Sequence, residues 1–585
     1  MKGVFGRVLN IDLEQEKVST ENISEEIYRH FLGGKGLATY LLLEKNRPGV
    51  DPFSPENHVV IAVGPACDTT VWGSSRYGLY TKSPLTGIYS ESYSGGRVAE
   101  FMTRTGYDAF VIAGRAASPT VLEVTDKEVK FHDAGEIWGM ETYDAQDALH
   151  RLFGRDIGVI VIGPAGENLV RFALVENNYW RSAGRTGVGA VLGAKNIKGL
   201  AFRGSATKEV AHPQILEDLW EEWKEKRKNH PAVKAFHTAG TPGLVAIVNQ
   251  MGGFPNRYWS QGTMKGWEKI SADALHEMLT VRPSACGKCF MACGRLSEVR
   301  EGRHKGLKLE GPEYETIYAL GGLCDINKID EIVYLNDLCD RLGMDTISSG
   351  NLAAFAIEAS QRRKIPDSLS YGDADAVSSL IKKMAYREGI GDTLANGIRY
   401  AALSWGMEDI AIHVKGMEPG GYDPRVFKGM GLAYATADRG ACHMRATVFK
   451  AEMSGQISPE QIEGKAGVMI DFEDRLTLQD SIMVCRFYRD LYLWEGLGAI
   501  IHGTTGMKLD HQNLKHLASN IRNATQRYNR REGLTRNDDT LPPRFFSEPI
   551  GAGHVLSKSD FERMLQDYYK LRGWDQDGVP LSQGS

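Results

Sequence analysis

Three cysteines near the middle of the chain, Cys286, Cys289 and Cys293, have a spacing that suits metal binding. Thiolates at this spacing can converge on one soft metal centre, and an iron–sulfur cluster usually takes four of them. Structural zinc sites more often use two close pairs of ligands, so the spacing favours a cluster over zinc or three unrelated buried thiols. A fourth thiolate must come from far away, and the other cysteines are Cys67, Cys324, Cys339, Cys442 and Cys485. We therefore expect an electron-transfer centre inside a large enzyme.

Composition and charge exclude several classes of protein. The length of 585 residues suggests roughly three or four domains and a large core. The formal net charge of −5 gives no basic excess for nucleic-acid binding. No run of apolar residues is long enough to span a membrane, and the start MKGVFGRVLNIDLEQEK lacks the apolar stretch of a signal peptide. Because the cysteines are too few for a disulfide framework, we expect a cytoplasmic enzyme with no membrane or nucleic-acid partner.

Local patterns divide the chain into a β-rich part and a helical part. Segments such as GRVLNIDL, HVVIAVG and IGVIVIG are short, rich in Val and Ile, and bounded by Gly, Asp or Asn. From about Pro213 onward the apolar spacing becomes helical, as in KIDEIVYLNDLCDRLGM. These patterns predict an α+β fold, in which a β-rich domain over residues 1–207 precedes two mainly α-helical domains over 208–415 and 416–585.

The stretch from Ser182 to Gly193, SAGRTGVGAVLG, could bind phosphate. Its small residues, with Arg181 and Arg185, let backbone N–H groups and guanidinium groups approach a phosphate closely. No Walker motif and no strand–GxGxxG–helix unit is present. A nucleotide is therefore not implied, and a phosphate-bearing cofactor of another kind stays open.

Motifs along nearly the whole chain resemble those of the tungsten-containing aldehyde ferredoxin oxidoreductase family. They include FLGGKGLATYLL, SSRYGLYTKSPLTG, RSAGRTGVGAVLGAKNIKGLA, VKGMEPGGYDPR and QRYNRREGLTRNDDTLPPRF. The resemblance implies a tungsten or molybdenum atom between two pterins held by the β-rich domain, one [4Fe–4S] cluster, and Mg²⁺ bridging the pterin phosphates. It also implies oxidation of aldehydes to carboxylic acids, with electrons passed to ferredoxin or a ferredoxin-like subunit.

The resemblance further assigns ligands to the cluster and the pterins. The fourth cluster ligand would be Cys485, at the end of a D-x4-C motif that begins at Asp480. Asp480 and a sister motif from Asp340 to Asp345 would each bind one pterin, although a helix cap is the alternative interpretation of each aspartate. The cofactor-binding residues implied elsewhere are Arg76, Tyr93, Gly95, Arg181, Ala183, Gly184, Arg185, Gly343, Arg445 and Val484. Tyr93 departs from the Asn expected there, which puts a side-chain contact to magnesium in doubt.

Two further residues are candidates for catalysis. The resemblance places Glu313, in EGPEYET, and His443, in RGACHMR, beside the metal. A carboxyl group in a dry pocket can exchange a proton near neutrality, and a histidine can donate a hydrogen bond to a substrate carbonyl. Glu310 and Glu315 are rivals for the carboxylate, and a lone histidine is often a packed core residue.

Alternatives to aldehyde oxidation stay open at this point. The chain could be the catalytic subunit of a tungsten-dependent aryl-CoA (benzoyl-CoA type) reductase, where a cysteine near Cys324 lies at the tungsten, or a non-catalytic iron–sulfur relay subunit. In homodimeric relatives an iron bridges subunits through an E-x-x-H motif, and the corresponding helix here offers Glu331 followed by Tyr334. We therefore expect an oligomer without that iron. The sequence does not identify the aldehyde, the metal (tungsten or molybdenum) or the oligomeric state (homodimer or hetero-oligomer).

Overall fold

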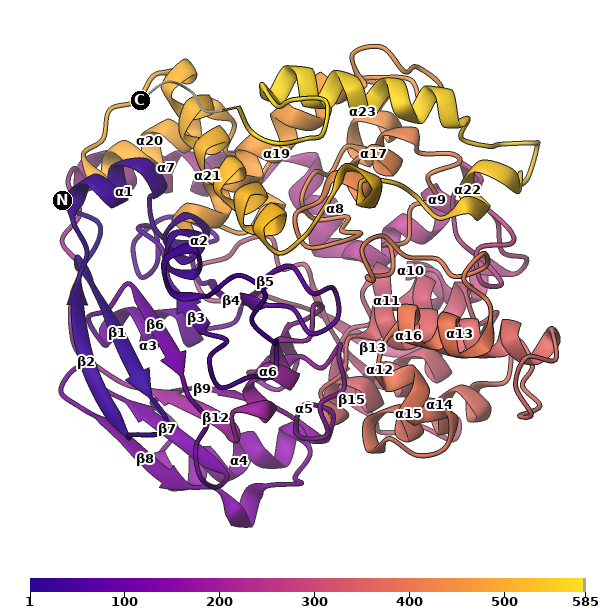
Figure 1. The fold of residues 1–585 in the computed structure, drawn as a ribbon, viewed down its shortest axis with the longest axis horizontal. Helices are drawn as coiled ribbons and strands as arrows, with labels where there is room; N and C mark the ends of the chain where they lie inside the picture. The colour runs from indigo at the N-terminus through magenta and orange to yellow at the C-terminus, as the bar shows by residue number, and fades with distance from the viewer. Residues whose placement is uncertain (582–585) are drawn as a thin grey trace.

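The computed structural model describes residues 1–581, and its N-terminal part contains two six-stranded sheets (Figure 1). The first sheet has the strand order β2-β1-β6-β3-β4-β5. Its strands are β1 (Arg7–Asp12), β2 (Lys17–Asn22), β3 (Val59–Ala62), β4 (Tyr77–Lys82), β5 (Tyr89–Ser94) and β6 (Ala109–Ala113). The second sheet has the order β11-β10-β9-β12-β7-β8. Its strands are β7 (Thr120–Val124), β8 (Val129–Asp133), β9 (Gly158–Val161), β10 (Val175–Asn177), β11 (Arg181–Ala183) and β12 (Ile197–Phe202).

Several inner strands of the two sheets are buried along their whole length. Every residue of β3, β4 and β12 is buried, as expected for strands that are covered on both faces. In the first sheet, β6 pairs parallel to β1 and antiparallel to β3. The strands β4 and β5 stand at one end of this sheet, and the N–H of Tyr89 in β5 donates to Asn529 of α21 (His511–Arg531) at 2.9 Å.

The rest of the chain is mainly helical, which confirms the predicted α+β class. The helices of eight or more residues are α2 (Gly34–Lys45), α4 (Thr142–Phe153), α7 (Pro213–Lys226), α8 (Pro231–Ala239), α12 (Ile329–Leu342), α13 (Thr346–Gln361), α14 (Ala374–Tyr386), α16 (Ile398–Trp405), α17 (Lys428–Thr436), α19 (Lys465–Ile482), α20 (Trp494–Thr505), α21 (His511–Arg531) and α23 (Lys558–Arg572). In Figure 1, α12 to α16 lie beside the sheets, and α17 to α23 lie along the top. No helix among residues 1–581 is long and apolar enough to cross a bilayer.

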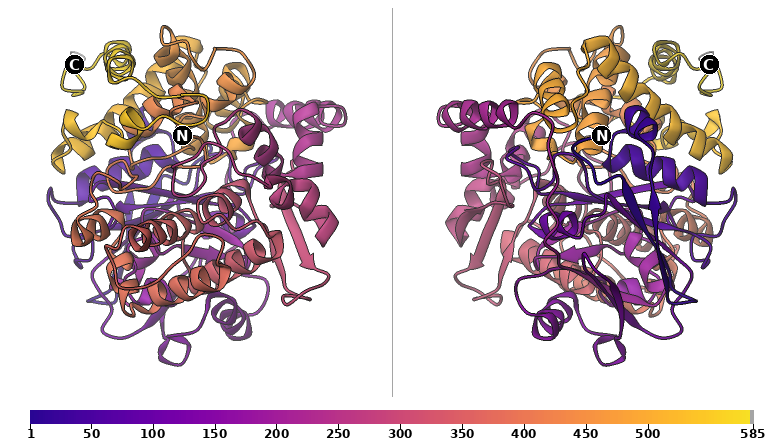
Figure 2. Two further views of the ribbon diagram at one scale, coloured as in Figure 1. Left: turned by 90° about the vertical axis from the view of Figure 1, so that its right-hand side faces the viewer. Right: turned by 90° about the vertical axis from the view of Figure 1, so that its left-hand side faces the viewer.

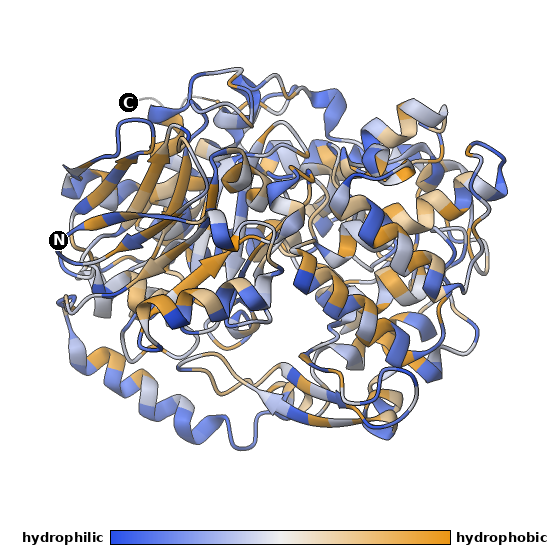
Figure 3. Cartoon of the chain, turned by 90° about the horizontal axis from the view of Figure 1, so that it is seen from below, coloured by the Kyte–Doolittle hydropathy of each residue, from blue (hydrophilic) through white to orange (hydrophobic). Residues whose placement is uncertain are grey.

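Local chemistry explains where several of these helices begin and end. The carboxylate of Asp510 accepts the N–H of Asn513 at 2.8 Å and so caps α21. Helix α12 ends at Gly343, whose φ of +78° is the left-handed conformation that glycine adopts without a Cβ clash. Many strands are coloured apolar and several outer helices carry both polar and apolar residues (Figure 3), as expected for amphipathic helices that pack on a core.

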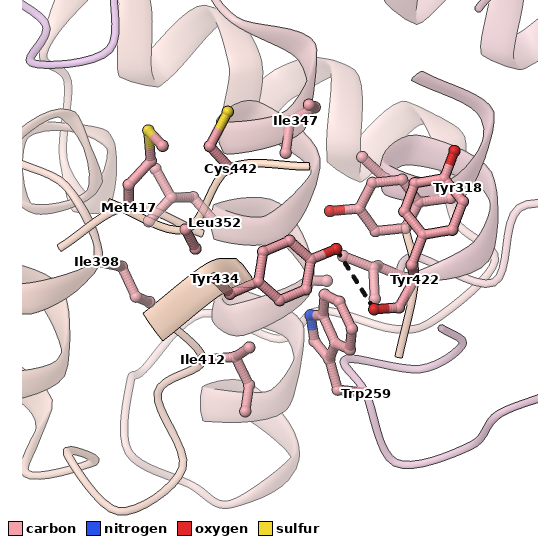
Figure 4. Close-up of a cluster of buried hydrophobic side chains, with 14 of the residues drawn as sticks. Trp259, Tyr318, Ile347, Leu352, Ile398, Ile412, Met417, Tyr422, Tyr434 and Cys442 are labelled. Carbon is pink, nitrogen blue, oxygen red and sulfur yellow. Dashed lines mark hydrogen bonds between the residues drawn. The ribbon is translucent and has the colours of Figure 1, made fainter. Parts of the chain in front are cut away.

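A large hydrophobic core joins the helical elements and reaches the candidate site. Trp259, Tyr318 and Tyr434 pack together in it (Figure 4). The hydroxyl of Tyr434 donates to the carbonyl of Tyr422 at 3.3 Å and to that of Gly420 at 2.9 Å. This aromatic core therefore fixes the loop before α17, which contributes Tyr422 to the cavity described below.

A third, three-stranded antiparallel sheet interrupts the region that the sequence predicts as helical. It contains β13 (Leu279–Ser284), β14 (Gly294–Val299) and β15 (Lys308–Glu310). With α7 and α8, these strands form one flank of the molecule (Figure 2). The loop between β13 and β14 carries Cys286, Cys289 and Cys293, so this small hairpin positions the cysteine motif.

Candidate active site and metal centre

The cysteine loop lies against the segment that follows α19, where Cys485 is found. The backbone of Gly73 joins the two segments, because its N–H donates to the carbonyl of Lys288 at 2.7 Å and its carbonyl accepts the N–H of Cys485 at 2.9 Å. The four motif cysteines are unbridged thiols and are partly buried. Cys485 therefore lies beside the motif of the other three cysteines, and its assignment as the fourth ligand, which the resemblance implies, stays a proposal.

The sulfur atoms are close enough to influence one another's ionisation. Burial, followed by the charges of Cys485 and Cys286, raises the pKa of Cys289 to about 11. Burial and the charge of Glu313 raise the pKa of Cys293 well above its usual range, with smaller contributions from Cys485 and Cys289. Residues 1–581 hold no preformed single-ion site of three or more Cys, His, Asp or Glu side chains. The thiols are thus near enough to one another to affect each other's charge.

Two predicted residues contact the cysteines directly. Arg76 Nη1 lies 3.7 Å from the sulfur of Cys485. A Cβ atom at Gly95 would lie 2.7 Å from the sulfur of Cys286, so no side chain fits between this backbone and the cysteine. Arg76 therefore brings a positive charge to Cys485, and Gly95 lets the backbone lie directly against Cys286.

A cavity of about 920 Å³ adjoins the cysteines and is lined by side chains from both sheets and the helical part. The predicted residues in its wall are Arg76, Tyr93, Gly95, Arg181, Gly184, Arg185, Cys293, Glu313, Asp340, Asp345 and His443. The predicted residues outside its lining are Ala183, Cys286, Cys289, Gly343, Arg445, Asp480, Val484 and Cys485. Most residues that the sequence singled out therefore surround one space, and the others belong to the layer behind it or to the cysteine group.

Asp480 and Arg445 form a buried ion pair behind this wall. Arg445 Nη1 lies 3.2 Å from Asp480 Oδ2, and it also contacts the buried carboxylate of Glu91. Arg486 pairs with the same aspartate. Both guanidinium groups bind Asp480 through Oδ2, which leaves Oδ1 as an acceptor, so the hydrogen bond from a pterin that the resemblance implies stays a prediction.

Asp340 and Asp345 differ in how their carboxylates are used. Asp345 caps α13, since it accepts the N–H of Ser348 at 2.9 Å, and it lies 3.5 Å from the guanidinium of Arg185. Asp340 accepts a hydrogen bond from Asn336 at 2.8 Å, and burial raises its pKa well above the usual range. Both line the cavity, so capping and cofactor binding are compatible functions at Asp345.

Tyr93 uses its hydroxyl inside the protein. The hydroxyl donates to Glu91 Oε2 at 2.6 Å, and the guanidinium groups of Arg76, Arg445 and Arg486 lie 6.0, 5.2 and 5.1 Å from the ring centroid. This cation–π packing gives the bulky residue a structural function at the position where the resemblance led us to expect Asn. The side-chain oxygen is thus already engaged.

The three candidate glutamates occupy different parts of the wall. Glu310 pairs with Arg181. Glu313 accepts a hydrogen bond from Thr241, and burial raises its pKa. Glu315 Oε1 lies 3.5 Å from His443 Nε2. Only Glu315 among these three is thus paired with the candidate histidine.

Burial controls the ionisation of this pair. It raises the pKa of Glu315 to about 8, against the lowering effects of the Gly421 N–H bonded to it at 3.0 Å and of Arg185. Burial and four nearby arginines, first among them Arg185, lower the pKa of His443 well below its usual range. A proton-exchanging carboxyl therefore lies beside a neutral imidazole.

Cys324 is a core thiol. It is fully buried, its sulfur lies 3.6 Å from the carbonyl of Gly350 and 3.8 Å from that of Ala319, and it does not line the cavity. These contacts support the interpretation of Cys324 as a residue of the hydrophobic core.

The sequence reasoning missed several cavity residues. Thr241, Tyr422 and Arg439 line it, and Arg439 stands inside the DRGACHMR motif, four residues before His443. Its guanidinium donates to the sulfur of Cys442 at 3.0 Å. The motif carried the signal for Arg439, and VKGMEPGGYDPR carried the same signal for Tyr422, whereas Thr241 had none, because only the tertiary fold brings it to the wall.

Comparison with known proteins defines the class to which this fold and site belong. Residues 8–204 match the aldehyde ferredoxin oxidoreductase N-terminal domain, and residues 218–584 match domains 2 and 3 of the same family. The chain belongs to the aldehyde ferredoxin oxidoreductase family and is an oxidoreductase.

Individual relatives are similar over almost their whole length. The tungsten-containing aldehyde ferredoxin oxidoreductase of Pyrococcus furiosus is 36% identical, with 99% of this chain and 97% of the relative covered. The WOR-like subunit of the aliphatic sulfonate oxidoreductase of the same organism is 29% identical, with 99% and 96% covered. A solved structure, the active-site complex BamBC of benzoyl coenzyme A reductase with 1,5-dienoyl-CoA, matches with a TM-score of 0.86 at 23% identity over 99% of this chain and 96% of that chain.

The cofactors of this family, a tungsten bis-pterin and a [4Fe–4S] cluster, fit the residues present. The buried Nε atoms of Arg185 and Arg445 lack a hydrogen-bond partner among the described residues, and so does Glu315 Oε1. Guanidinium donors of this kind suit pterin phosphates, and grouped thiols suit the cluster. Magnesium stays a prediction.

Proposed function

We propose that this chain oxidises aldehydes to carboxylic acids and passes the electrons to a ferredoxin or a ferredoxin-like subunit. The observation that carries the proposal is the pairing of Glu315 with His443 on the wall of the cavity that also contains Cys293. The family membership and the names of the relatives support the same reaction.

Glu315 is the proposed proton acceptor. Conversion of an aldehyde to a carboxylic acid takes its new oxygen from water and releases protons together with two electrons. A carboxyl whose pKa is about 8 changes ionisation within the working range, as a general base requires. We therefore assign this function to Glu315 in preference to Glu313, whose carboxylate is bonded to Thr241.

His443 is the proposed hydrogen-bond donor to the substrate carbonyl. Its lowered pKa keeps the imidazole neutral, so one ring nitrogen donates and the other accepts. Its Nδ1 is buried, and a Cβ atom at Gly420 would lie 2.7 Å from it, so Nε2, on the side of Glu315, is the nitrogen proposed to meet the substrate. A donor aimed at a carbonyl oxygen stabilises the negative charge that develops there during attack on the carbon.

Redox chemistry at the site belongs to the cofactors. When bound, the tungsten bis-pterin supplies the two-electron oxidation, and the cluster passes electrons on one at a time. Arg76, Arg181 and Arg185 would bind the anionic groups of the pterins, and Asp340 would accept hydrogen bonds from a pterin ring. Cys286, Cys289, Cys293 and Cys485 are the proposed cluster ligands.

A second candidate, reduction of an aryl-CoA, is favoured by the structural likeness to BamBC alone. At 23% identity that likeness supports the fold and no substrate. The position of Cys324 argues against it, because the thiol is packed in the core and bonded to backbone carbonyls.

The two reactions are separated by assaying the holoenzyme with both substrate classes. We expect about one tungsten and about four irons per chain, and aldehyde-dependent reduction of an artificial one-electron acceptor. Reduction of benzoyl-CoA by a low-potential donor, without aldehyde oxidation, would establish the alternative. A chain that holds iron but no pterin would instead be a relay subunit.

A further inference from the structure

Tyr488 brings a phenol hydroxyl to one of the proposed cluster ligands. Its oxygen lies 3.5 Å from the sulfur of Cys289, and the side chain is fully buried. The same oxygen accepts the backbone N–H of Phe290 at 3.1 Å. Because that N–H occupies a lone pair of the phenol oxygen, the hydroxyl proton is available to the sulfur. The contact is therefore a donation from the phenol to Cys289.

The ring of Tyr488 has little freedom to turn away from the sulfur. A Cβ atom at Gly73 would lie 2.6 Å from the ring, so the backbone there is already against it. The ring of Phe290 packs edge-on with a centroid distance of 5.0 Å, and that of Tyr492 stacks at 5.4 Å. The N–H of Tyr488 also donates to the carbonyl of Cys485 at 2.9 Å, which fixes the start of the side chain.

We infer that Tyr488 is a positioning residue that raises the reduction potential of the iron–sulfur cluster through its hydrogen bond to Cys289. The inference rests on the proposed ligation of the cluster by this cysteine. One-electron reduction of a cluster adds negative charge to its sulfurs, and a hydrogen-bond donor stabilises the reduced form more than the oxidised form. Loss of the hydroxyl should therefore make the cluster harder to reduce.

The hydroxyl acts on a different sulfur from the nearby guanidinium group. Arg76 approaches Cys485 from the cavity wall, whereas Tyr488 approaches Cys289 from the aromatic layer of Phe290 and Tyr492. Removal of the phenol oxygen therefore leaves the cation and the cavity unchanged. This separation lets one atom be tested without disturbing the proposed catalytic pair.

The test compares Tyr488→Phe with a matched control in the purified holoenzyme. Tyr492→Phe removes the hydroxyl of the adjacent buried tyrosine, which donates to the carbonyl of Trp72 at 3.3 Å and not to a sulfur. The cluster midpoint potential is measured by a redox titration followed by electron paramagnetic resonance. We expect Tyr488→Phe to shift the midpoint negatively by about 59 mV, a tenfold change in a one-electron equilibrium constant. Tyr492→Phe should match the wild type.

Each outcome decides the inference. A Tyr488→Phe protein with full iron content and an unchanged midpoint would overturn it, as would an equal shift in Tyr492→Phe, and both would leave the proposed function standing. A wild-type protein that binds no iron would instead overturn the proposed ligation. If Tyr488→Phe fails to retain iron, 3-fluorotyrosine at this position keeps the packing and makes the hydroxyl a stronger donor. That protein should show a less negative midpoint, and no shift would refute the inference.

Discussion

Glu315 Oε1 lies 3.5 Å from His443 Nε2, although the two residues come from distant parts of the sequence. Neither carboxylate oxygen of Glu315 is bonded to a cation. Oε1 faces the neutral imidazole of His443, and Oε2 accepts the N–H of Gly421. A buried carboxyl without a cationic partner has a raised pKa, while the arginines around His443 keep the imidazole neutral. This relationship separates the two functions of proton acceptor and hydrogen-bond donor.

The first prediction concerns the assignment of the carboxylate. Glu315→Gln keeps the size of the side chain and removes its basicity, so kcat should fall about 100-fold or more. The matched control is Glu313→Gln, which alters a carboxylate bonded to Thr241 and should leave kcat within about tenfold of wild type. Tungsten and iron contents, measured on the same samples, should be normal in both. The opposite ranking of the two variants would return the function to Glu313.

The second prediction is a pH dependence. A general base works when it is ionised, and the ionised fraction of Glu315 grows as the pH rises through its pKa of about 8. We therefore expect kcat/KM to increase with pH and to level off above about 8. The pKa of His443 is too low for the imidazole to add a second change of rate with pH near neutrality. Glu315→Gln should abolish the rise of kcat/KM with pH. A rise that persisted in this variant would assign the titration to another group.

The α+β class and the motif of Cys286, Cys289 and Cys293 could be predicted because each has a local signal. Val- and Ile-rich runs such as VVIA of β3 mark buried strands, and the three cysteines are regularly spaced, whereas Cys485 was implied only by the family resemblance. The small sheet was missed although Leu279, Val281 and Pro283 of β13 alternate with polar residues, because the segment is largely exposed and contains a proline, which argues against a strand. The structure places β13 at the edge of its sheet, where a proline is tolerated.

The choice among Glu310, Glu313 and Glu315 could not be made from the sequence for a geometric reason. The backbone changes from extended at Glu313 to helical at Tyr314, so side chains two residues apart leave the chain in unrelated directions. The contact between Tyr488 and Cys289 was unpredictable in the same way, because it joins the segment after α19 to the β13–β14 loop.

The third prediction tests the distant cluster ligand. Cys485→Ser should remove the cluster from most molecules and lower the stability of the fold, since ligand binding and folding are coupled. Cys324→Ser is the control, because that thiol is buried in the core away from the cavity. It should cost stability but retain about four irons per chain. A Cys485→Ser protein with four irons and a normal visible spectrum would disprove the assignment.

The last prediction concerns the subunit-bridging iron that the family resemblance led us to consider. Glu331 is the carboxylate of the corresponding helix, and Arg303 engages both of its oxygens, at 2.8 and 2.6 Å. His304 also contacts it at 3.0 Å and stacks on Tyr334 with a centroid distance of 4.4 Å. A cation is therefore already bound where a metal ion would have to sit, and a second one would be repelled.

E-x-x-H spacing does occur elsewhere, at Glu209–His212 and Glu301–His304, so spacing alone does not decide the matter. We expect the protein, purified without an affinity tag, to contain no iron beyond its cluster and to co-purify with a small subunit of ferredoxin-like cysteine spacing. Tyr334→His supplies a histidine three residues after Glu331 and should still bind no extra iron while Arg303 is present. A homodimer with an additional iron on its two-fold axis would contradict both expectations.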